Sequence, residues 1–142
     1  MAFSGCRKLQ QFSDEPALTF VNFVQAGADS ARIIVSFTDG DGDIGLRASD
    51  TLPPHDFNLF LEYFELQNGE WIKPELATPF YYRIPPLSES DNGKALQGEI
   101  EVNLSPFYYA PGADSIRYEV RLRDFALNES NIITTDLILV PQ

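Results

Sequence analysis

A run of alternating aspartates and glycines is the part of this sequence best suited to chemistry. Asp39, Asp41 and Asp43, here called the aspartate run, are separated by single glycines that let the backbone curl and bring the carboxylates to one centre. Ca²⁺ binds roughly six to eight oxygen ligands at about 2.3–2.6 Å, and three carboxylates can begin that shell. The run therefore predicts a Ca²⁺ site. The alternative is a glycine-rich turn whose aspartates hydrogen-bond to their own backbone.

The aspartate run matches only part of an EF-hand calcium loop. Its carboxylates occupy the first, third and fifth positions of that motif, and Asp50 falls at the twelfth. However, Ile44 stands at the sixth position, where an EF-hand requires glycine, and the flanking segments resemble strands. We therefore expect a metal site built on strands instead of an EF-hand.

Short strand-like segments fill most of the chain, and no long segment has the spacing of an amphipathic helix. In residues 97–104 and 116–123, apolar and polar side chains alternate, as in strands with one face on a core and one in water. The expected strands are residues 17–25, 32–38, 57–66, 71–73, 80–84, 97–104, 116–123 and 132–140. This pattern predicts an all-β fold, an antiparallel immunoglobulin-like β-sandwich of about seven strands, with a closed barrel as the alternative.

The strand order places another acidic residue near the aspartate run. If residues 32–38 form strand B and residues 116–123 form strand F, the loops that follow these strands lie at the same pole of the sandwich. Asp124 begins the second loop, and we predict that it completes the metal site. Asn128 offers a further oxygen, although with Ser130 it could simply shape a turn.

Composition limits the classes of partner. The chain has 142 residues, which suits one domain, and 44% of them are hydrophobic, which supplies a core. Its 10 basic and 21 acidic residues give a net charge of -11, which repels nucleic-acid phosphates and anionic lipid. No apolar run approaches the ~20 residues that span a bilayer. We expect no nucleic-acid partner, and contact with a membrane only through an anchor.

Catalysis has little support in the sequence. His55 is the only histidine, and no motif for an activated nucleophile accompanies it. Carboxylates for glycosidic cleavage could be drawn from Asp43, Asp56 and Glu62, but sequence does not set their separation. We predict that the chain is not an enzyme, with a small carboxylate-dependent hydrolase as the less favoured alternative.

The N-terminal region suggests an anchor. We expect a lipobox remnant and polar tether in residues 1–16 and the sandwich in residues 17–142. Phe-Ser-Gly at 3–5 precedes Cys6, and this order resembles the end of a bacterial lipoprotein signal, where a large apolar and two small residues precede the lipidated cysteine. The sequence thus predicts lipidation of Cys6. The alternative is an incidental free thiol.

Several stretches resemble known families. Residues 111–122, Pro-Gly-Ala-Asp-Ser-Ile-Arg-Tyr-Glu-Val-Arg-Leu, resemble the E–F corner and F strand of fibronectin type III and immunoglobulin-like domains. This resemblance implies a tyrosine corner at Tyr118, with an ordinary core tyrosine as the alternative. Other stretches resemble a group of uncharacterised lipoproteins of Bacteroidetes type, which implies an immunoglobulin-like fold and an anchor in the bacterial envelope, at the outer membrane, but no established activity. Those stretches are residues 13–16, 36–45, 98–100 and 123–131.

The resulting functional hypothesis is a non-catalytic, envelope-anchored module with a calcium-binding loop, which supports structure or recognises an unknown protein or glycan. A glycan-binding module is the main alternative, because Pro-Phe-Tyr-Tyr occurs twice, at 79–82 and 106–109. Exposed tyrosines, with Trp71, could stack on sugar rings. Such residues can equally cover the edges of a sandwich and fill the ends of its core.

Overall fold

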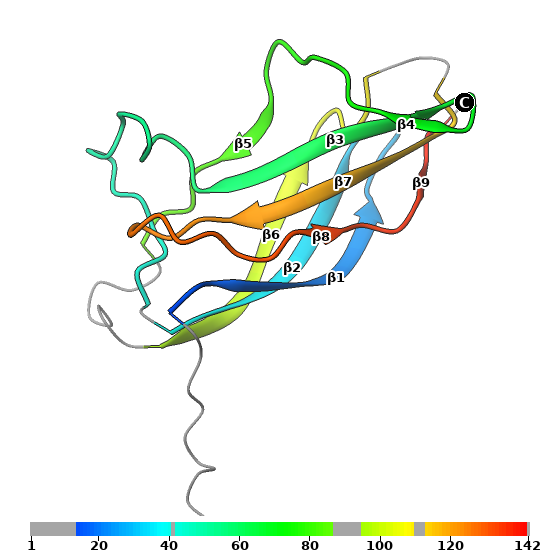
Figure 1. Cartoon of the computed structure of the whole chain (residues 1–142). Helices are drawn as coiled ribbons and strands as arrows, with labels where there is room; N and C mark the ends of the chain where they lie inside the picture. Colours follow the sequence, from blue (N-terminus) through cyan, green and yellow to red (C-terminus); the bar gives the residue numbers. More distant parts are fainter. Residues whose placement is uncertain (1–13, 41, 87–94, 110–112, 142) are drawn as a thin grey trace, which may run out of the picture.

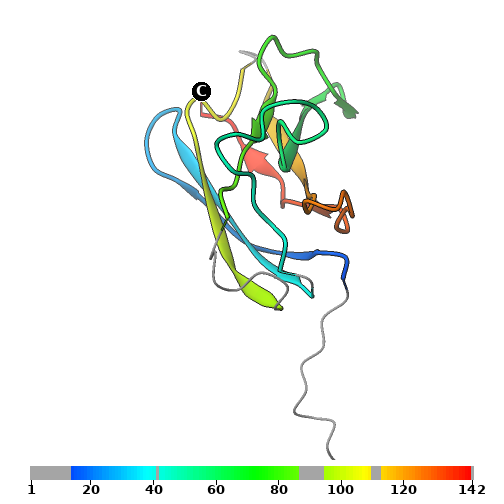
Figure 2. The same cartoon turned by 90° about the vertical axis from the view of Figure 1, so that its left-hand side faces the viewer.

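The chain folds into two antiparallel β-sheets packed face to face, as Figures 1 and 2 show. The computed structural model describes residues 14–40, 42–86, 95–109 and 113–141. Within these residues no helix is long and apolar enough to cross a membrane. The strands are β1 (Ala17–Gln25), β2 (Ala31–Asp39), β3 (Leu59–Gln67), β4 (Glu70–Ile72), β5 (Phe80–Tyr82), β6 (Leu96–Leu104), β7 (Ser115–Leu122), β8 (Ile133–Thr134) and β9 (Ile138–Leu139).

The strand order is that of an immunoglobulin-like sandwich, so the predicted all-β fold is confirmed. One sheet has the order β1-β2-β6. In the other sheet, β3 and β7 pair at the centre, β4 and β5 share the outer side of β3, and β8 and β9 share the outer side of β7. These shared sides explain why the described residues contain nine strands in about seven strand positions.

The C-terminal segment is two short strands, although the sequence pattern predicted one strand over 132–140. Thr135, between β8 and β9, is buried, and its hydroxyl accepts a hydrogen bond from the Tyr118 N–H at 3.1 Å. The Thr135 N–H in turn donates to the Tyr118 carbonyl at 2.9 Å. The side chain of Thr135 thus takes a place in the ladder that a backbone carbonyl would otherwise fill, and the regular pairing is interrupted there.

Alternation along the strands builds the core between the two sheets. β2 alternates buried and half-buried positions along its whole length, and β7 does so over nearly all of its length. The residues of these two strands that are at most 1% exposed are Ile33, Val35, Asp39, Ile116, Tyr118, Val120 and Leu122. Apart from Asp39 and Tyr118, these residues are aliphatic. Asp39, at the end of β2, is therefore an unusual charged residue in the buried core.

Tyr118 joins the core to the connection between β6 and β7. Its ring is fully buried, and its hydroxyl donates a hydrogen bond to the carbonyl of Phe107. A strand-F tyrosine that bonds backbone upstream is the arrangement of a tyrosine corner, which the resemblance implied. The ring of Phe107 is also fully buried, so this connection is fixed to the core by both residues.

Substitutions on the two faces of the strands should differ sharply in cost. Val120→Ala should lower the free energy of unfolding by about 2 kcal/mol, because it leaves a cavity in a site that is 1% exposed. Glu101→Ala should cost less than ~0.5 kcal/mol, because Glu101 makes only a long, exposed ion pair with Arg32, at 3.5 Å. Urea denaturation of both variants measures the difference. Equal losses would contradict the assignment of faces.

The fold brings the loops after β2 and β7 to the same end of the sandwich, at the left of Figure 1. β2 ends at Asp39, and the chain leaves β7 through Arg123 and Asp124. The backbones of the two loops are hydrogen-bonded, since the Phe125 N–H donates to the Asp43 carbonyl at 3.1 Å. The predicted meeting of these loops is therefore present.

Candidate metal centre

Three aspartates from two distant parts of the chain converge at this end. Asp39 closes β2, Asp43 lies four residues further on, and Asp124 lies in the loop after β7. One carboxylate oxygen from each lies within 4.8 Å of the other two. Among the described residues, this is the group of acidic, histidine or cysteine side chains whose spacing suits a metal ion.

Hydrogen bonds hold each carboxylate in place, through one oxygen in Asp39 and Asp43 and through both oxygens in Asp124. The Asp43 N–H donates to Asp39 Oδ2 at 3.0 Å, and the Ala126 N–H donates to Asp43 Oδ2 at 3.1 Å. Asn128 donates to Asp124 twice, from its backbone N–H to Oδ1 at 2.7 Å and from Nδ2 to Oδ2 at 3.1 Å. These bonds fix the directions of the carboxylates before any ligand arrives.

Two carboxylate oxygens of the cluster have no hydrogen-bond donor, and these oxygens make the cluster suitable for a cation. Asp39 and Asp124 are only 0% and 2% exposed. Within the described residues, Asp39 Oδ1 and Asp43 Oδ1 are buried and have no hydrogen-bond donor in reach. Leaving a buried acceptor without a partner costs roughly 1–3 kcal/mol, and more when the group is charged. A cation between these oxygens would remove that cost, so the residues present fit a metal ion.

Glycines give the first loop the shape that the site needs. Gly42 has φ = +66°, a conformation that side-chain-bearing residues rarely adopt, and its N–H donates to the Asp39 carbonyl at 3.3 Å. Asp43 also lines an open cavity of about 160 Å³. Asp43 is the member of the cluster that lines this cavity.

Burial and mutual repulsion disturb the protonation of the cluster. Burial raises the pKa of Asp39 to about 7, helped by the hydrogen bond that Asp39 can donate to the Asp43 carboxylate only when it is protonated, and by the charges of Asp43 and Asp124. Burial also raises the pKa of Asp124, although the hydrogen bonds from Asn128 act in the opposite direction. Without a cation, the cluster therefore holds protons more tightly than isolated aspartates do.

Some predicted site residues meet here and others do not. Asp39, Asp43 and Asp124 come together as predicted. Asp41 and Cys6 lie outside the described residues. Asp50, the residue at the EF-hand twelfth position, instead accepts a hydrogen bond from the Arg47 N–H at 2.8 Å, in agreement with the rejection of that motif.

The supports of the site were not visible in the sequence. Arg83 and Arg123 bind backbone carbonyls of the long loop before β3: Arg83 donates to Asp56 O at 2.7 Å, and Arg123 donates to Pro54 O at 2.7 Å. These contacts could not be predicted from the sequence, because their acceptors are backbone carbonyls, which every residue has.

A side-chain amide ties β1 to the loop after β7. The Leu18 N–H donates to Asn131 Oδ1 at 2.8 Å, and Asn131 Nδ2 donates to the Leu18 carbonyl at 3.0 Å. Asn131 thus pairs with Leu18 as a neighbouring strand would. This clamp closes the sandwich at the end that carries the aspartate cluster, between two edges whose described residues do not pair through their backbones.

Comparison with known proteins supplies no template for this site. No protein-family model, curated protein or solved structure matches the chain. The chemistry of the aspartate cluster is therefore the basis for a functional proposal.

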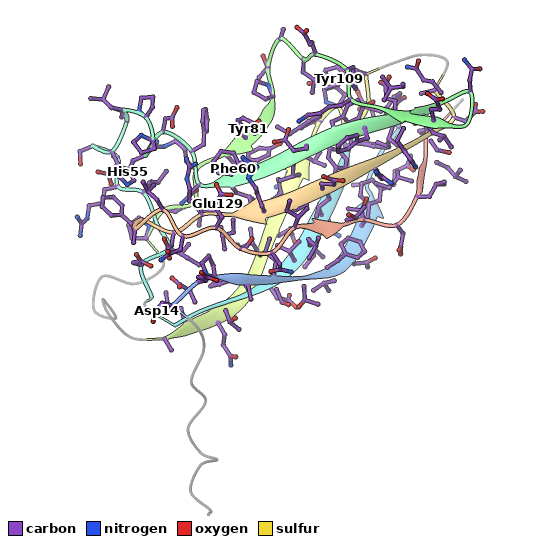
Figure 3. The ribbon with its side chains drawn as sticks, in the orientation of Figure 1. Asp14, His55, Phe60, Tyr81, Tyr109 and Glu129 are labelled. Atoms are coloured by element: carbon purple, nitrogen blue, oxygen red, sulfur yellow. The ribbon has the colours of Figure 1, made fainter. Side chains whose placement is uncertain are left out.

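His55 lies at the same end of the sandwich as Glu129 (Figure 3). Its ring stacks on Phe125 with 4.1 Å between centroids, and Nε2 lies 2.9 Å from the Phe125 carbonyl. These contacts give His55 a packing role on the loop that carries Asp124. Glu62, considered above for a carboxylate pair with Asp43, is instead bound by Lys73 at 3.0 Å.

The aromatic repeats are mostly internal. Phe80 and Phe107 are buried in the core, and the Tyr81 hydroxyl donates to Glu62 at 3.0 Å. Tyr109 is 44% exposed, and its ring packs against the buried Phe80 ring with 5.5 Å between centroids. The second residue of each repeat is thus part of the core, and Tyr81 and Tyr109 are both engaged by neighbouring side chains, which does not favour an exposed stacking platform.

The metal-free domain should lose stability as the pH rises from about 4 to about 7. Asp39 has a pKa of about 7 when folded and about 3.9 when unfolded. The folded state thus binds the proton more tightly in this window, and its advantage disappears once the pH passes the folded pKa. Asp39→Asn should flatten the dependence. Urea denaturation in metal-free buffer at about pH 5 and about pH 8 tests this. The prediction would be contradicted if the free energy of unfolding changed by the same amount between the two pH values in wild type and variant.

Proposed function

We propose that this chain is a non-catalytic module whose β-sandwich is locked by a calcium ion between the loops after β2 and β7. Its role is structural support or recognition of a partner in the cell envelope. The observation that carries the proposal is the pair of buried carboxylate oxygens, Asp39 Oδ1 and Asp43 Oδ1, that have no donor in the described residues. An ion bound there would add a further link between two loops that are already joined by hydrogen bonds from the Phe125 and Ala126 N–H groups to Asp43.

The ligand chemistry favours calcium over other cations. The cluster consists of carboxylates, without the imidazole or thiolate groups that Zn²⁺ and Cu²⁺ prefer. Mg²⁺ requires a tighter octahedron and releases its water reluctantly, so a buried, irregular site should bind it less well. Asp41 and backbone carbonyls are the sources we propose for the remaining oxygens.

Direct binding measurements test this proposal. After chelation and desalting, calorimetric titration should show one Ca²⁺ per chain. Asp43→Asn should weaken binding at least ~10-fold, because it removes a charged ligand. Asp50→Asn should leave binding unchanged, since Asp50 caps the Arg47 N–H outside the cluster. Absence of Ca²⁺ binding at millimolar concentration would overturn the proposal.

We place the module at the envelope through a lipid on Cys6, on the strength of the lipobox-like residues before it. A precursor expressed with a bacterial lipoprotein leader should partition into the detergent phase, and Cys6→Ala should move the protein to the aqueous phase. Equal partitioning of the two forms would remove the anchor from the proposal without affecting the metal site.

Glycan binding remains the alternative for partner recognition. It has less support, because Phe80 and Phe107 fill the core and Tyr81 is engaged by Glu62. A glycan array probed with the calcium-loaded domain distinguishes the two. Binding that is lost on Tyr109→Ala would favour the glycan module.

A further inference from the structure

A buried carboxylate lies at the end of the sandwich opposite to the aspartate cluster. Glu65, near the end of β3, pairs with Ile116 near the start of β7, whereas Asp124 lies just beyond the other end of β7. The side chain of Glu65 shares the inward face of β3 with the buried Tyr63, and Glu65 is only 2% exposed. A buried carboxylate is normally balanced by a cation, so its partners need to be identified.

Neutral groups hold this carboxylate. The Tyr63 hydroxyl donates to Glu65 Oε2 at 2.8 Å, and Gln67 Nε2 donates to Oε1 at 3.0 Å. Lys73 lies just past β4, the strand that pairs with this part of β3, but its ammonium lies 3.0 Å from a Glu62 oxygen. None of the ion pairs among the described residues includes Glu65. Each oxygen of Glu65 thus has a donor, but no positive charge balances the carboxylate in the described part of the chain.

Glu65 also lines a hollow with mostly apolar walls. The hollow has a volume of about 370 Å³, and its other lining residues are Pro74, Glu75, Leu76, Ala77, Thr78 and Tyr109. Tyr109 is 44% exposed, and its backbone N–H donates to the Tyr63 hydroxyl at 3.0 Å. One hydroxyl therefore positions both Glu65 and the tyrosine wall. The volume falls in the range of roughly 300–1,000 Å³ that small-molecule sites occupy.

We propose that this hollow binds a primary alkylammonium group, with its N–H groups donated to Glu65 and its alkyl chain against Leu76 and Tyr109. The ammonium brings the positive charge that the described surroundings of Glu65 do not supply. It also carries three donors. Glu75 and Thr78 add oxygens to those of Glu65 on the wall of the hollow. This inference is independent of the metal site.

The lining disfavours other kinds of ligand. No basic residue lines the hollow, and the chain carries a net charge of -11, so an anion would be repelled. A metal ion fits less well, because Glu65 and Glu75 do not belong to the described group of acidic side chains with the spacing of metal ligands. A neutral ligand would leave the buried carboxylate without a balancing charge.

Titration with n-pentylammonium chloride at constant ionic strength tests the proposal. Amide NMR spectra of the full chain should show saturable shifts confined to residues 63–67, 74–78 and 109, with a dissociation constant on the order of 1 mM. Pentanol has the same chain without the charge and should bind at least ~10-fold more weakly, because it makes no charge-assisted hydrogen bonds to Glu65. Absence of shifts up to about 20 mM pentylammonium overturns the proposal, as does equal binding of pentanol.

Glu65→Gln removes the charge and keeps the shape of the side chain, so it should raise the dissociation constant at least ~10-fold. Glu119→Gln is the matched control. It removes one charge from the same sheet, but Glu119 lies outside the hollow and is paired with Arg117 at 3.8 Å, so binding should be unchanged. Tyr109→Ala leaves the carboxylate in place and should weaken binding at least ~3-fold, because it removes apolar contact with the chain. Binding that neither Glu65→Gln nor Tyr109→Ala weakens would overturn the proposed site.

The same ammonium group could come from a free amine or from a lysine side chain of a partner protein. Nα-acetyl-lysine N-methylamide, titrated in the same way, distinguishes these sources. Tighter binding than pentylammonium, at the same amides, would assign the hollow to a partner's lysine, and weaker binding would assign it to a free amine. Shifts by the lysine compound that persist in Glu65→Gln would count against the site.

Discussion

Calcium at a hundredfold excess over its dissociation constant should stabilise the chelated domain by about 2.7 kcal/mol, because the ion binds the folded state and the unfolded chain has no assembled site. For a domain of this size the melting temperature should rise by roughly 5–11 °C. Differential scanning calorimetry with and without millimolar calcium measures the shift. Magnesium at the same concentration should produce a smaller one.

Asp39→Asn is the decisive variant for this shift. The amide keeps the shape of the carboxylate but removes a charge that is 0% exposed, so the calcium shift should disappear. The metal-free variant should melt at the same temperature as wild type or slightly above it, because repulsion with Asp43 and Asp124 is relieved. Asp50→Asn is the matched control and should retain the full shift. A wild-type protein that melts identically with and without calcium would leave the loop as a structural turn.

Gly45→Ala should cost the fold more stability than the same change at Gly27, Gly69 or Gly98. A Cβ at this position would lie 2.4 Å from Pro86 Cα and 2.7 Å from Pro86 N, and the backbone has φ = +143°. Neither obstacle is a flexible side chain, so the loop or the segment at Pro86 must move. We expect a loss of about 3–5 kcal/mol from the combined clash and strain.

Gly69→Ala separates strain from clash. Gly69 also has a positive φ, +81°, in the turn between β3 and β4, but nothing lies within 4 Å of an added Cβ. Its cost should be only about 1–2 kcal/mol. Urea denaturation of the two variants gives the comparison. A Gly45→Ala variant no less stable than Gly69→Ala would show that the loop at Gly45 yields easily and that the metal site is not rigidly supported.

The alternation of side chains predicted most of the fold and, through the strand order, the meeting of Asp39, Asp43 and Asp124. In β7, Ile116, Tyr118, Val120 and Leu122 face the core as the period of two requires. Once the two strands were assigned, the common pole of an immunoglobulin-like sandwich placed Asp124 beside the aspartate run. That inference needed only strand direction, which local sequence carries well.

The supporting contacts could not be predicted, because they join residues far apart through groups without a specific signal. Leu18 and Asn131 are separated by 113 positions, and only the closed sandwich brings them together. Thr135 has the β-branched side chain of an ordinary strand residue, yet its hydroxyl interrupts the strand. The role of Arg121 was also hidden, since alternation places it in water but its guanidinium packs 4.3 Å from the centre of the Phe60 ring.

The clamp formed by Asn131 has a mechanical consequence. A force applied to the chain before Ala17 is transmitted to the domain at the start of β1. There Ala17 pairs with Thr38, which is next to Asp39. The first bonds under tension are therefore this pair and the two hydrogen bonds between Leu18 and Asn131. Because Asn131 follows the loop that carries Asp124, the tension reaches both loops that contribute to the aspartate cluster at once. If calcium occupies the cluster as proposed, the force needed to separate this end of the domain should therefore be higher with the ion bound than without it.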